Sequence, residues 1–142
     1  MILLVEDNAD DEALTLRAFK RNHLENQVFV VRDGAEALDF LFCTGIYADR
    51  DPSELPQVTV LDLKLPKLDG LEVLRRLRAD KRTHMLPVVI LTSSKAEKDV
   101  IEAYKLGVNS YMRKPVDFNE FLEATHLIGL YWLALNHGPP LP

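Results

Sequence analysis

Short, uninterrupted runs of apolar residues recur along the chain and are separated by turn residues and helical patterns. The runs are Met1–Val5, Val28–Val31, Val58–Leu61, Val88–Leu91 and Asn109–Met112. Continuous runs of Val, Ile and Leu are typical of strands that are buried on both faces of a parallel sheet. Between them, apolar residues at helical spacing predict crossover helices. This alternation predicts an α/β fold in which about five helices cover both faces of a five-stranded parallel sheet.

Length and composition limit the function classes that need to be considered. The 142 residues, 47% of them hydrophobic, are enough for one domain with a real core but not for two of similar size. The formal charge of −5 argues against a general nucleic-acid surface, which requires clustered basic residues. The one basic concentration, between Arg75 and Arg82, is expected to be a solvated helix end. We therefore expect no direct binding to nucleic acid.

Cysteine usage and hydropathy bear on the compartment. Cys43 is the single cysteine, so no disulfide can form within the chain, in agreement with a reducing environment. No leader precedes the first apolar run, and no apolar stretch approaches the roughly 18 residues that a membrane span needs. These features predict a cytoplasmic protein without membrane association.

Polar residues stand where four of the predicted strands end. They are Glu6-Asp7, Asp62, Thr92 and Lys114-Pro115. Because ligands in open α/β sheets bind beyond the carboxyl ends of the strands, these side chains are expected to meet at one edge. Carboxylates, a hydroxyl and an ammonium together suit a divalent cation and a phosphoryl group.

The carboxylates among these residues predict a magnesium site. Crowded carboxylates repel one another and are driven toward protonation unless a cation neutralises them. Mg2+ accepts a few carboxylates, keeps several waters and is often found beside phosphate, whereas zinc would call for His or Cys ligands. The simpler alternative is that Glu6 and Asp7 only cap a helix or face solvent.

Asp62 is the candidate for covalent chemistry. It lies between a buried strand and the turn residues Pro66 and Gly70, where a core would ordinarily hold an apolar residue. A carboxylate can attack phosphorus and form an acyl phosphate. Thr92 and Lys114 would then neutralise and orient the phosphoryl oxygens. Considered singly, Thr92 would more often be a helix cap and Lys114 a surface charge.

These motifs resemble the receiver domain of two-component response regulators over nearly the whole chain. The matching segments are Leu3–Asn8, Leu61–Pro66 with Asp69-Gly70, Leu91–Ser93 and Tyr111–Pro115. The resemblance implies a flavodoxin-like, doubly wound sheet with strand order 2-1-3-4-5. It also implies that Asp62 accepts a phosphoryl group from a histidine kinase and relays the signal through a change in conformation and protein interactions.

The resemblance further assigns roles by position. It implies that Asp7, Asp62 and the main-chain carbonyl of Lys64 bind Mg2+, while Glu6 acts through water. Thr92 and Lys114 would contact the phosphoryl group. Tyr111 matches an aromatic switch residue that turns inward as Thr92 moves; its alternative role is simple packing. Lys114-Pro115 matches a peptide bond that is usually cis in the family.

Lys64 and Ser94 lie two residues beyond Asp62 and Thr92, at positions that tune the lifetime of the acyl phosphate in this family. Ser93 and Ser94 are also candidates to cap the helix that follows.

A magnesium-dependent aspartyl phosphatase is a second hypothesis for the function, but such enzymes need a second acid where this chain has Lys64. A third is a receiver-like dimerisation module that does not use phosphate.

The last predicted helix carries two apolar stripes where one would cover the sheet. The inward stripe contains Phe121, Leu122, Thr125, Ile128, Gly129, Trp132 and Leu135. The second stripe, formed by Leu127, Leu130, Tyr131 and Ala134, predicts a dimer surface. The alternative is that the helix tucks beneath the long loop between Thr44 and Gln57. We expect a receiver domain over residues 1–136 and an extended arm over residues 137–142.

A narrower resemblance concerns the C-terminal region. Tyr131–Asn136 followed by Pro139-Pro140, together with Gly45–Ala48, are similar to the single-domain regulators that accompany bacterial phytochromes. That similarity implies a phytochrome as the kinase. It also implies a homodimer through the fourth helix, last strand and last helix, with exchanged C-terminal arms. The downstream protein is not indicated by the sequence.

Overall fold

A five-stranded parallel sheet forms the centre of the molecule, with strand order β2-β1-β3-β4-β5. The computed structural model describes residues 1–24 and 27–140. The strands are β1 (Ile2–Val5), β2 (Val28–Val31), β3 (Val58–Leu61), β4 (Val88–Thr92) and β5 (Ser110–Arg113). The predicted strand order is confirmed. β4 and β5 each extend one residue beyond the predicted run, to Thr92 and Arg113.

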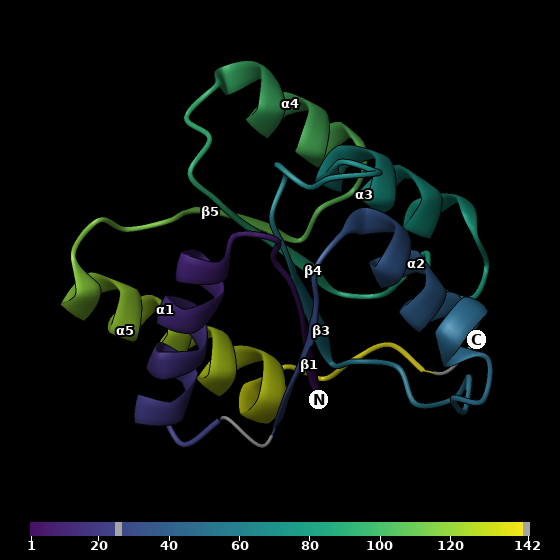
Figure 1. Ribbon diagram of the computed structural model, residues 1–142, viewed down its shortest axis with the longest axis horizontal. Helices are drawn as coiled ribbons and strands as arrows, with labels where there is room; N and C mark the ends of the chain where they lie inside the picture. The colour runs from purple at the N-terminus through teal and green to yellow at the C-terminus, as the bar shows by residue number, and fades with distance from the viewer. Residues whose placement is uncertain (25–26, 141–142) are drawn as a thin grey trace.

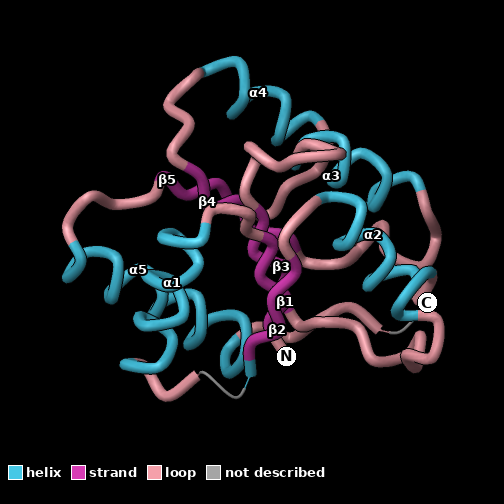
Figure 2. The backbone as a smooth tube through the Cα atoms, in the orientation of Figure 1, coloured by secondary structure: helices cyan, strands magenta, loops and turns pink. Residues whose placement is uncertain are grey.

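Helices cover both faces of this sheet, as Figures 1 and 2 show. They are α1 (Ala9–Arg21), α2 (Gly34–Phe42), α3 (Gly70–Ala79), α4 (Glu97–Lys105) and α5 (Phe118–Gly129). α1 and α5 lie on one face, and α2, α3 and α4 lie on the other (Figure 1). A 3-10 turn, η2 (Gly45–Tyr47), interrupts the long loop after α2, and a π-helical segment, η3 (Leu130–Leu135), continues α5. The predicted doubly wound architecture is confirmed.

The two faces of the sheet contribute to two separate apolar layers. On the α1 and α5 side, Phe19, Phe121 and Ile128 pack against Ile2 and Val60. On the other side the layer is formed by residues of α2, α3 and the inner strands, including Leu38, Leu41, Leu61, Leu74, Leu77 and Ile90. Every residue of β1, β3 and β4 is buried, as the continuous apolar runs predict.

Among the described residues, four of the five α-helices begin with an acidic or amide side chain that accepts a main-chain N–H of the first turn. These N-cap residues are Asn8, Asp33, Asp69 and Asp117. α4 differs, because its N-cap is Ala96 and no side chain caps it. The expectation that Ser93 or Ser94 caps this helix was therefore wrong. The Ser94 hydroxyl is engaged by a residue of α4 instead, as described below.

The C-terminal region departs from expectation at two points. The Lys114–Pro115 peptide bond is trans, because the described residues contain no cis peptide. Leu135, which was placed on the inward stripe, is 67% exposed. The helical hydrogen-bond pattern widens to a π-helix from Leu130 onward, so the α-helical spacing that placed Leu135 inward no longer applies there.

The predicted arm, residues 137–142, follows η3. Residues 137–140 have no helix or strand structure, and residues 141–142 of the arm lie outside the described residues. Gly138, Pro139 and Pro140 lie along a cavity of about 180 Å³ whose other walls include Pro56, Pro87 and Trp132. The arm thus runs along its own chain, beside the residues that precede β3 and β4 (Figure 1). None of the described helices is long and apolar enough to span a membrane.

Candidate functional site

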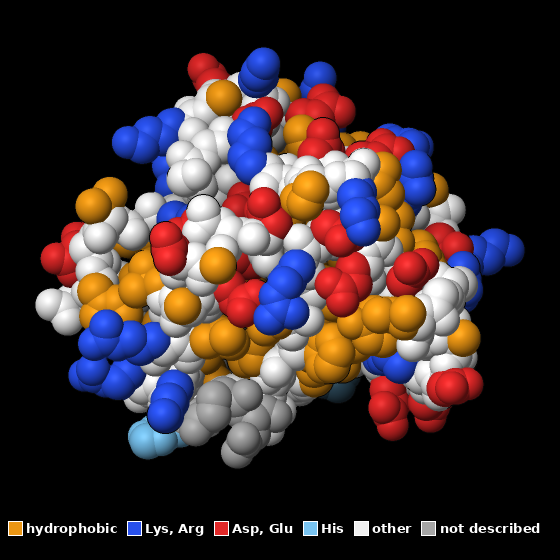
Figure 3. Space-filling model, viewed as in Figure 1, with side chains coloured by type: hydrophobic (Ala, Val, Ile, Leu, Met, Phe, Trp, Pro, Cys, Tyr) orange, Lys and Arg blue, Asp and Glu red, His pale blue; other side chains and the backbone are white. Residues whose placement is uncertain are grey.

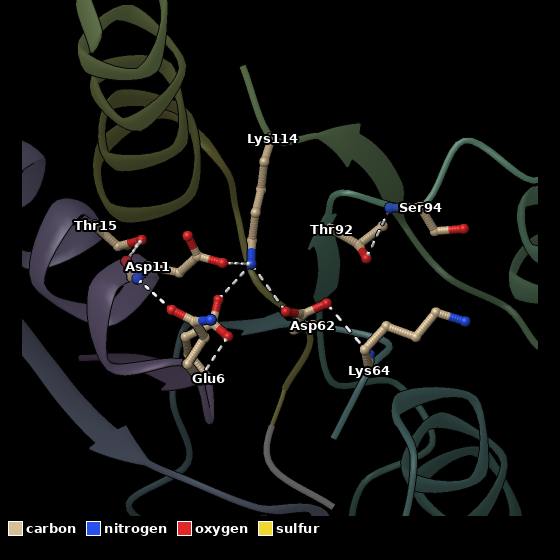
Figure 4. Close-up of polar contacts among 9 residues, drawn as sticks. Glu6, Asp11, Thr15, Asp62, Lys64, Thr92, Ser94 and Lys114 are labelled. Atoms are coloured by element: carbon tan, nitrogen blue, oxygen red, sulfur yellow. Dashed lines mark hydrogen bonds and ion pairs between the residues drawn. The ribbon is translucent and has the colours of Figure 1, made fainter. Parts of the chain in front are cut away.

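Main-chain pairing continues one residue beyond the strands and brings three charged side chains together. The N–H of Asp62 donates to the carbonyl of Val5 at 3.1 Å, and the N–H of Lys114 donates to the carbonyl of Thr92 at 2.8 Å. Glu6 follows Val5 directly, so its side chain stands beside that of Asp62. Figure 4 shows Glu6, Asp62 and Lys114 pointing toward one another. The predicted convergence at the carboxyl edge of the sheet is confirmed for these residues.

Gly70 allows α3 to begin directly against the site. A Cβ at this position would lie 2.2 Å from the main-chain oxygen of Asp62. The N–H of Gly70 donates to the carbonyl of Leu63 at 2.9 Å, which closes the turn after β3. Any larger residue would push this turn away from the strand. The Asp69-Gly70 pair therefore fixes the main chain that carries Asp62.

Lys114 is the centre of the charge network. Its Nζ lies 2.6 Å from Glu6 Oε1, 2.9 Å from Asp62 Oδ2 and 2.9 Å from Asp11 Oδ2. An ammonium has three protons to donate, so these three carboxylates use its full capacity. The Lys114 side chain is only 9% exposed. Any new anion that contacts Lys114 must therefore replace one of these partners.

Asp11 is a site residue that sequence reasoning missed. It lies in the first turn of α1, where an acid is favoured by the helix dipole whatever its neighbours. The Asn8 cap holds this turn in place, since Asn8 Oδ1 accepts the N–H of Asp11 at 2.9 Å. Three consecutive acids, Asp10, Asp11 and Glu12, open the helix. The one signal that could have distinguished Asp11 is its position on the side of the helix that faces the strand ends.

The acids of the network differ in their protonation. Burial raises the pKa of Glu6 to about 7, against the opposing hydrogen bond from Lys114, and the charge of Asp62 raises it further. Burial also acts to raise the pKa of Asp62, but the hydrogen bond and charge of Lys114 outweigh it, so the pKa of Asp62 is lowered. Asp62 thus stays a carboxylate at neutral pH. An ionised carboxylate is what a nucleophile toward phosphorus requires.

The acidic residues suit a divalent cation. Carboxylate oxygens of Glu6, Asp7 and Asp62 all lie within 4.8 Å of one another. Glu6 and Asp62 are buried while Asp7 is exposed, so the cluster opens to solvent on one side. A hard cation with oxygen ligands would relieve the repulsion that raises the pKa of Glu6. The donor set therefore fits Mg2+, although Glu6 already contacts Lys114 directly.

Thr92 and Tyr111 are linked through the main chain of Ser94. The N–H of Ser94 donates to Thr92 Oγ1 at 3.3 Å, and the hydroxyl of Tyr111 donates to the carbonyl of Ser94 at 3.4 Å. Thr92 is completely buried, and its side chain contributes to lowering the pKa of Asp62. Tyr111 is half-buried at the edge strand β5. The two residues expected to move together thus share one neighbour.

Lys64 and Ser94 meet at Asp99, a second residue that sequence reasoning missed. Ser94 Oγ donates to Asp99 Oδ2 at 2.6 Å, and Lys64 Nζ lies 3.9 Å from the same oxygen. The N–H of Lys64 donates to Asp62 Oδ1 at 3.3 Å. Asp99 lies in the first turn of α4 and was not distinguishable there from an ordinary helix-dipole acid.

The residues predicted as a dimer surface are exposed in the single chain. Leu127 and Tyr131 are each 51% exposed and Leu130 is 43% exposed, and Ala134 is exposed as well. A groove of about 640 Å³ beside them is lined by Met112, Leu127 and Tyr131 among others. This exposure argues against the alternative in which the helix tucks beneath the loop between Thr44 and Gln57, although Trp132 and the end of that loop line one cavity.

Comparison with known proteins gives consistent results. The model of the "Response regulator receiver domain" family matches residues 2–126. The chain is 40% identical over 139 residues to the probable methanogenesis regulatory protein FilR2 of Methanothrix harundinacea, covering 98% of this chain and 87% of that protein. It is 37% identical over 133 residues to the response regulator Rcp1 of a Synechocystis strain, covering 94% and 88% respectively.

Solved structures show the same relationship. The phosphorylated cyanobacterial phytochrome response regulator RcpA superposes with a TM-score of 0.88 at 36% identity, covering 98% of this chain and 97% of that one. The Mn2+-bound form of Rcp1 superposes with a TM-score of 0.86 at 35% identity, covering 98% of both chains. The chain belongs to the response regulator receiver domain family of two-component systems.

Proposed function

We propose that Asp62 is the phosphoacceptor of this receiver and that Thr92 and Lys114 bind the transferred phosphoryl group. The observation that carries this assignment is the state of Asp62, which is buried beside the Lys114 ammonium and has a lowered pKa. The Asp62 carboxylate is thus ionised, and its contact with Lys114 holds it in one orientation. Of the other acids around Lys114, Glu6 has a raised pKa, and the Asp11 side chain is 39% exposed where that of Asp62 is 7% exposed.

The transfer is a substitution at phosphorus. One oxygen of Asp62 forms a bond to the phosphorus of a kinase phosphohistidine while the bond from phosphorus to the imidazole nitrogen breaks, and the imidazole leaves with that electron pair. Lys114 exchanges a carboxylate contact for a phosphoryl oxygen, and the Thr92 hydroxyl donates to another. The residues of this chain thereby position the group and offset its negative charge.

Mg2+ is the proposed cofactor. Asp7, Asp62 and the main-chain carbonyl of Lys64 would hold it, and Glu6 would act through water. When bound, the cation supplies positive charge to the phosphoryl oxygens. Support comes from the three-carboxylate cluster and from the relative Rcp1, whose structure contains Mn2+.

The proposed output is a change of conformation and interactions and not turnover of a separate substrate. An aspartyl phosphatase would need an acid two residues beyond Asp62, but Lys64 occupies that position and its ammonium lies toward Asp99. Movement of Thr92 toward a phosphoryl group would disturb Ser94, and through it Tyr111 and α4. We assign Thr92 and Tyr111 to the switch on this basis.

The test is covalent phosphorylation by a small phosphodonor in the presence of Mg2+. Intact-protein mass spectrometry should detect one phosphoryl group on the wild type and none on Asp62→Asn. Asp10→Asn is the matched control, because Asp10 is an exposed acid on the same first turn of α1 as Asp11. A wild-type chain that stays unmodified would remove the proposed function and leave the receiver-like dimer as the better explanation.

The proposed donor is a histidine kinase of the phytochrome class. The support is the similarity to RcpA, which is itself a cyanobacterial phytochrome response regulator. Phosphotransfer from a purified phytochrome kinase to wild type but not to Asp62→Asn is the expected result. Transfer that is no faster than from an unrelated histidine kinase would contradict this choice of donor.

We also propose a homodimer through α4, β5 and α5. Leu127, Leu130, Tyr131 and Ala134 on α5 and η3 would form its centre, and Ile101 and Tyr104 of α4, 48% and 53% exposed, would extend it. Because a large exposed apolar patch usually marks an interaction surface, a second copy of the chain is the expected occupant. Tyr131→Glu should give a monomer in sedimentation velocity, while Ile46→Glu, at an exposed apolar residue in η2, should not.

The arm over residues 137–142 is proposed to strengthen this dimer by exchange between two copies. The described part of the arm packs along its own chain, so exchange requires release from the cavity beside Trp132. Deleting residues 138–142 should weaken the dimer. An unaltered sedimentation coefficient at low protein concentration would show that the arm has no part in it.

A further inference from the structure

Asp99 connects two loops at the entrance to the site. Its Oδ2 accepts the hydroxyl of Ser94 at 2.6 Å and lies 3.9 Å from Lys64 Nζ. The Asp99 side chain is 13% exposed, so this carboxylate is mostly shielded from water. The 2.6 Å contact is typical of a strong hydrogen bond from a hydroxyl to a carboxylate. One oxygen of α4 thus holds a hydroxyl from the β4 loop and an ammonium from the β3 loop.

The held groups point away from the acceptor carboxylate. Figure 4 shows the side chains of Lys64 and Ser94 directed away from Asp62, although the N–H of Lys64 is 3.3 Å from Asp62 Oδ1. The side chain of Lys64 therefore starts beside Asp62 and leads out of the site. A lysine side chain is flexible and has four carbons, so it could turn back toward the group that Asp62 carries.

Little besides Asp99 restrains Lys64. The Lys64 side chain is 72% exposed, and the residue lines a cavity of about 350 Å³ together with Asp69, Leu71 and Asp99. In the described part of the chain, Asp99 is the acid within ion-pair distance of its ammonium. An exposed pair of this kind is weak, so the ammonium would readily move to a stronger anion if Asp99 were absent.

We propose that Asp99 is a positioning residue that keeps the Lys64 ammonium to one side of the site and thereby shortens the lifetime of the acyl phosphate. The proposal rests on the proposed phosphorylation of Asp62. Ser94 takes part by fixing the orientation of the Asp99 carboxylate. The first turn of α4 then acts on hydrolysis without touching the phosphoryl group.

The chemical step is hydrolysis of the mixed anhydride. A water oxygen forms a bond to phosphorus while the bond from phosphorus to the Asp62 oxygen breaks. The Asp62 carboxylate leaves with the electron pair, and the phosphate retains both water protons as dihydrogen phosphate. The water must approach opposite to the Asp62 oxygen, because attacking and leaving oxygens are roughly in line. A Lys64 ammonium paired with the phosphoryl oxygens would cover that approach.

The experiment measures the half-life of covalent phosphate after removal of the phosphodonor, at constant Mg2+. Asp99→Ala should lengthen the half-life about fivefold, the effect of one hydrogen bond or ion pair on a rate. Asp99→Asn should lengthen it in the same direction, because the amide still accepts from Ser94 but no longer attracts an ammonium. Glu97→Ala is the matched control, since Glu97 is an exposed acid in the same first turn.

A double-mutant cycle distinguishes positioning from a general structural effect. In the Lys64→Ala background, Asp99→Ala should leave the half-life unchanged, because no ammonium remains to be released. Thermal unfolding of every variant verifies that each is folded. Lengthening in both Asp99 variants that disappears in the Lys64→Ala background supports the proposal.

The other outcomes overturn it. An unchanged or shorter half-life in Asp99→Ala and Asp99→Asn would show that Asp99 does not hold Lys64 away. Lengthening that persists without Lys64, or that Glu97→Ala reproduces, would assign the effect to α4 or to charge in general. A wild type that takes no phosphate on Asp62 would remove the proposed function together with this inference, whereas the preceding outcomes leave the proposed function intact.

Discussion

Helices α3 and α4 cover the same face of the sheet but are attached to it in different ways. α3 buries Gly70, Val73, Leu74 and Leu77, so an apolar stripe holds it along its length. α4 buries Ala103 alone, and its large apolar residues Ile101 and Tyr104 are about half exposed. The difference in burial between the two helices indicates that α3 belongs to the rigid scaffold and that α4 is more weakly attached. Figure 3 shows charged side chains of both signs interspersed over one face of the molecule.

Polar contacts hold the two ends of α4. At its beginning, Asp99 accepts from Ser94, which is bonded in turn to Thr92. At its end, the Arg78 guanidinium of α3 donates to the carbonyl of Gly107 at 2.9 Å. Polar contacts of this kind can exchange partners at a smaller cost in free energy than a packed apolar stripe. The beginning of α4 is therefore the part that can respond to the site.

Truncation of apolar side chains tests this comparison with the largest expected effect. Leu74→Ala on α3 should lower the free energy of unfolding by about 2 to 5 kcal/mol, because a fully buried leucine leaves a cavity. Ile101→Ala on α4 should lower it by less than about 1 kcal/mol, since that side chain is half exposed. Urea denaturation of the monomer measures both. Equal losses would show that α4 is packed as firmly as α3.

Protonation of Glu6 provides a second test, in which the free energy of unfolding should change by about 2 to 3 kcal/mol with pH. The pKa of Glu6 is about 7 in the folded chain and 4.5 without these surroundings, so between these values the folded chain holds a proton that the unfolded chain has lost. Stability should therefore fall as the pH rises through this window and level off above about pH 7. The lowered pKa of Asp62 changes stability only below about pH 3.8, which lies outside this window.

The measurement is urea denaturation between pH 5 and 8 in the presence of EDTA, so that no cation neutralises the site. Glu6→Gln should remove most of the dependence of the unfolding free energy on pH. Hydrogen exchange measures the same dependence helix by helix. Protection of α3, which opens with the whole fold, should follow the pH dependence of global stability, while protection of α4 should not. A pH dependence shared by both helices would mean that α4 opens only when the whole domain unfolds.

Arg78 tests the fixed end of α4 with an intermediate effect. Its guanidinium also donates to the carbonyl of Leu86 at 2.8 Å and to Asn109 Oδ1 at 3.1 Å. Arg78→Lys keeps a charge but loses the planar set of donors, and should cost about 1 to 2 kcal/mol. Arg76→Lys, on an exposed residue of the same helix that pairs with Glu72, should cost almost nothing by thermal or urea unfolding.

The sequence alone supported the strands, the helical crossovers and the convergence of Glu6, Asp62 and Lys114. Continuous apolar runs and polar residues at strand ends are local signals, and the parallel topology turns them into neighbours. The contact of Asp11 with Lys114 and that of Asp99 with Ser94 could not be predicted in the same way. Lys114 and Asp11 lie far apart in the sequence, whereas Ser94 and Asp99 lie close together but belong to a loop and to the helix after it. In both cases an acid in a first turn already has a sufficient local reason to be there.

The beginning of α4 was missed for a related reason. Ser94 has the side chain of a good N-cap, but its hydroxyl donates to Asp99, and the helix begins three residues later, at Glu97. A side-chain hydrogen bond five residues along the chain thus replaces the capping contact. The exposed position of Leu135 has a different origin, because a π-helical turn changes the spacing on which the stripe was counted. In both cases the local pattern held up to the point where a competing side-chain contact or an irregular turn intervened.

The smallest expected effect concerns the beginning of α4. Ser94→Ala removes the hydroxyl that Asp99 accepts and should lower the free energy of unfolding by less than about 1 kcal/mol. Locally the effect should be larger in proportion: amides in the first turn of α4 should exchange about fivefold to tenfold faster, since one hydrogen bond of about 1 kcal/mol holds that turn. Amides near Lys105 should keep their rate, because the contact between Arg78 and Gly107 remains.

Ser93→Ala is the matched control, since Ser93 is the exposed neighbour of Ser94. Hydrogen exchange with mass spectrometry on peptides that separate residues 96–101 from residues 102–107 resolves the two ends of the helix. Uniform acceleration along α4 would show that the helix moves as one body, whereas acceleration limited to the first turn would locate the hinge near its C-terminal end. In the second case phosphorylation at Asp62 could move the beginning of α4 through Thr92 and Ser94 while α3 stays in place.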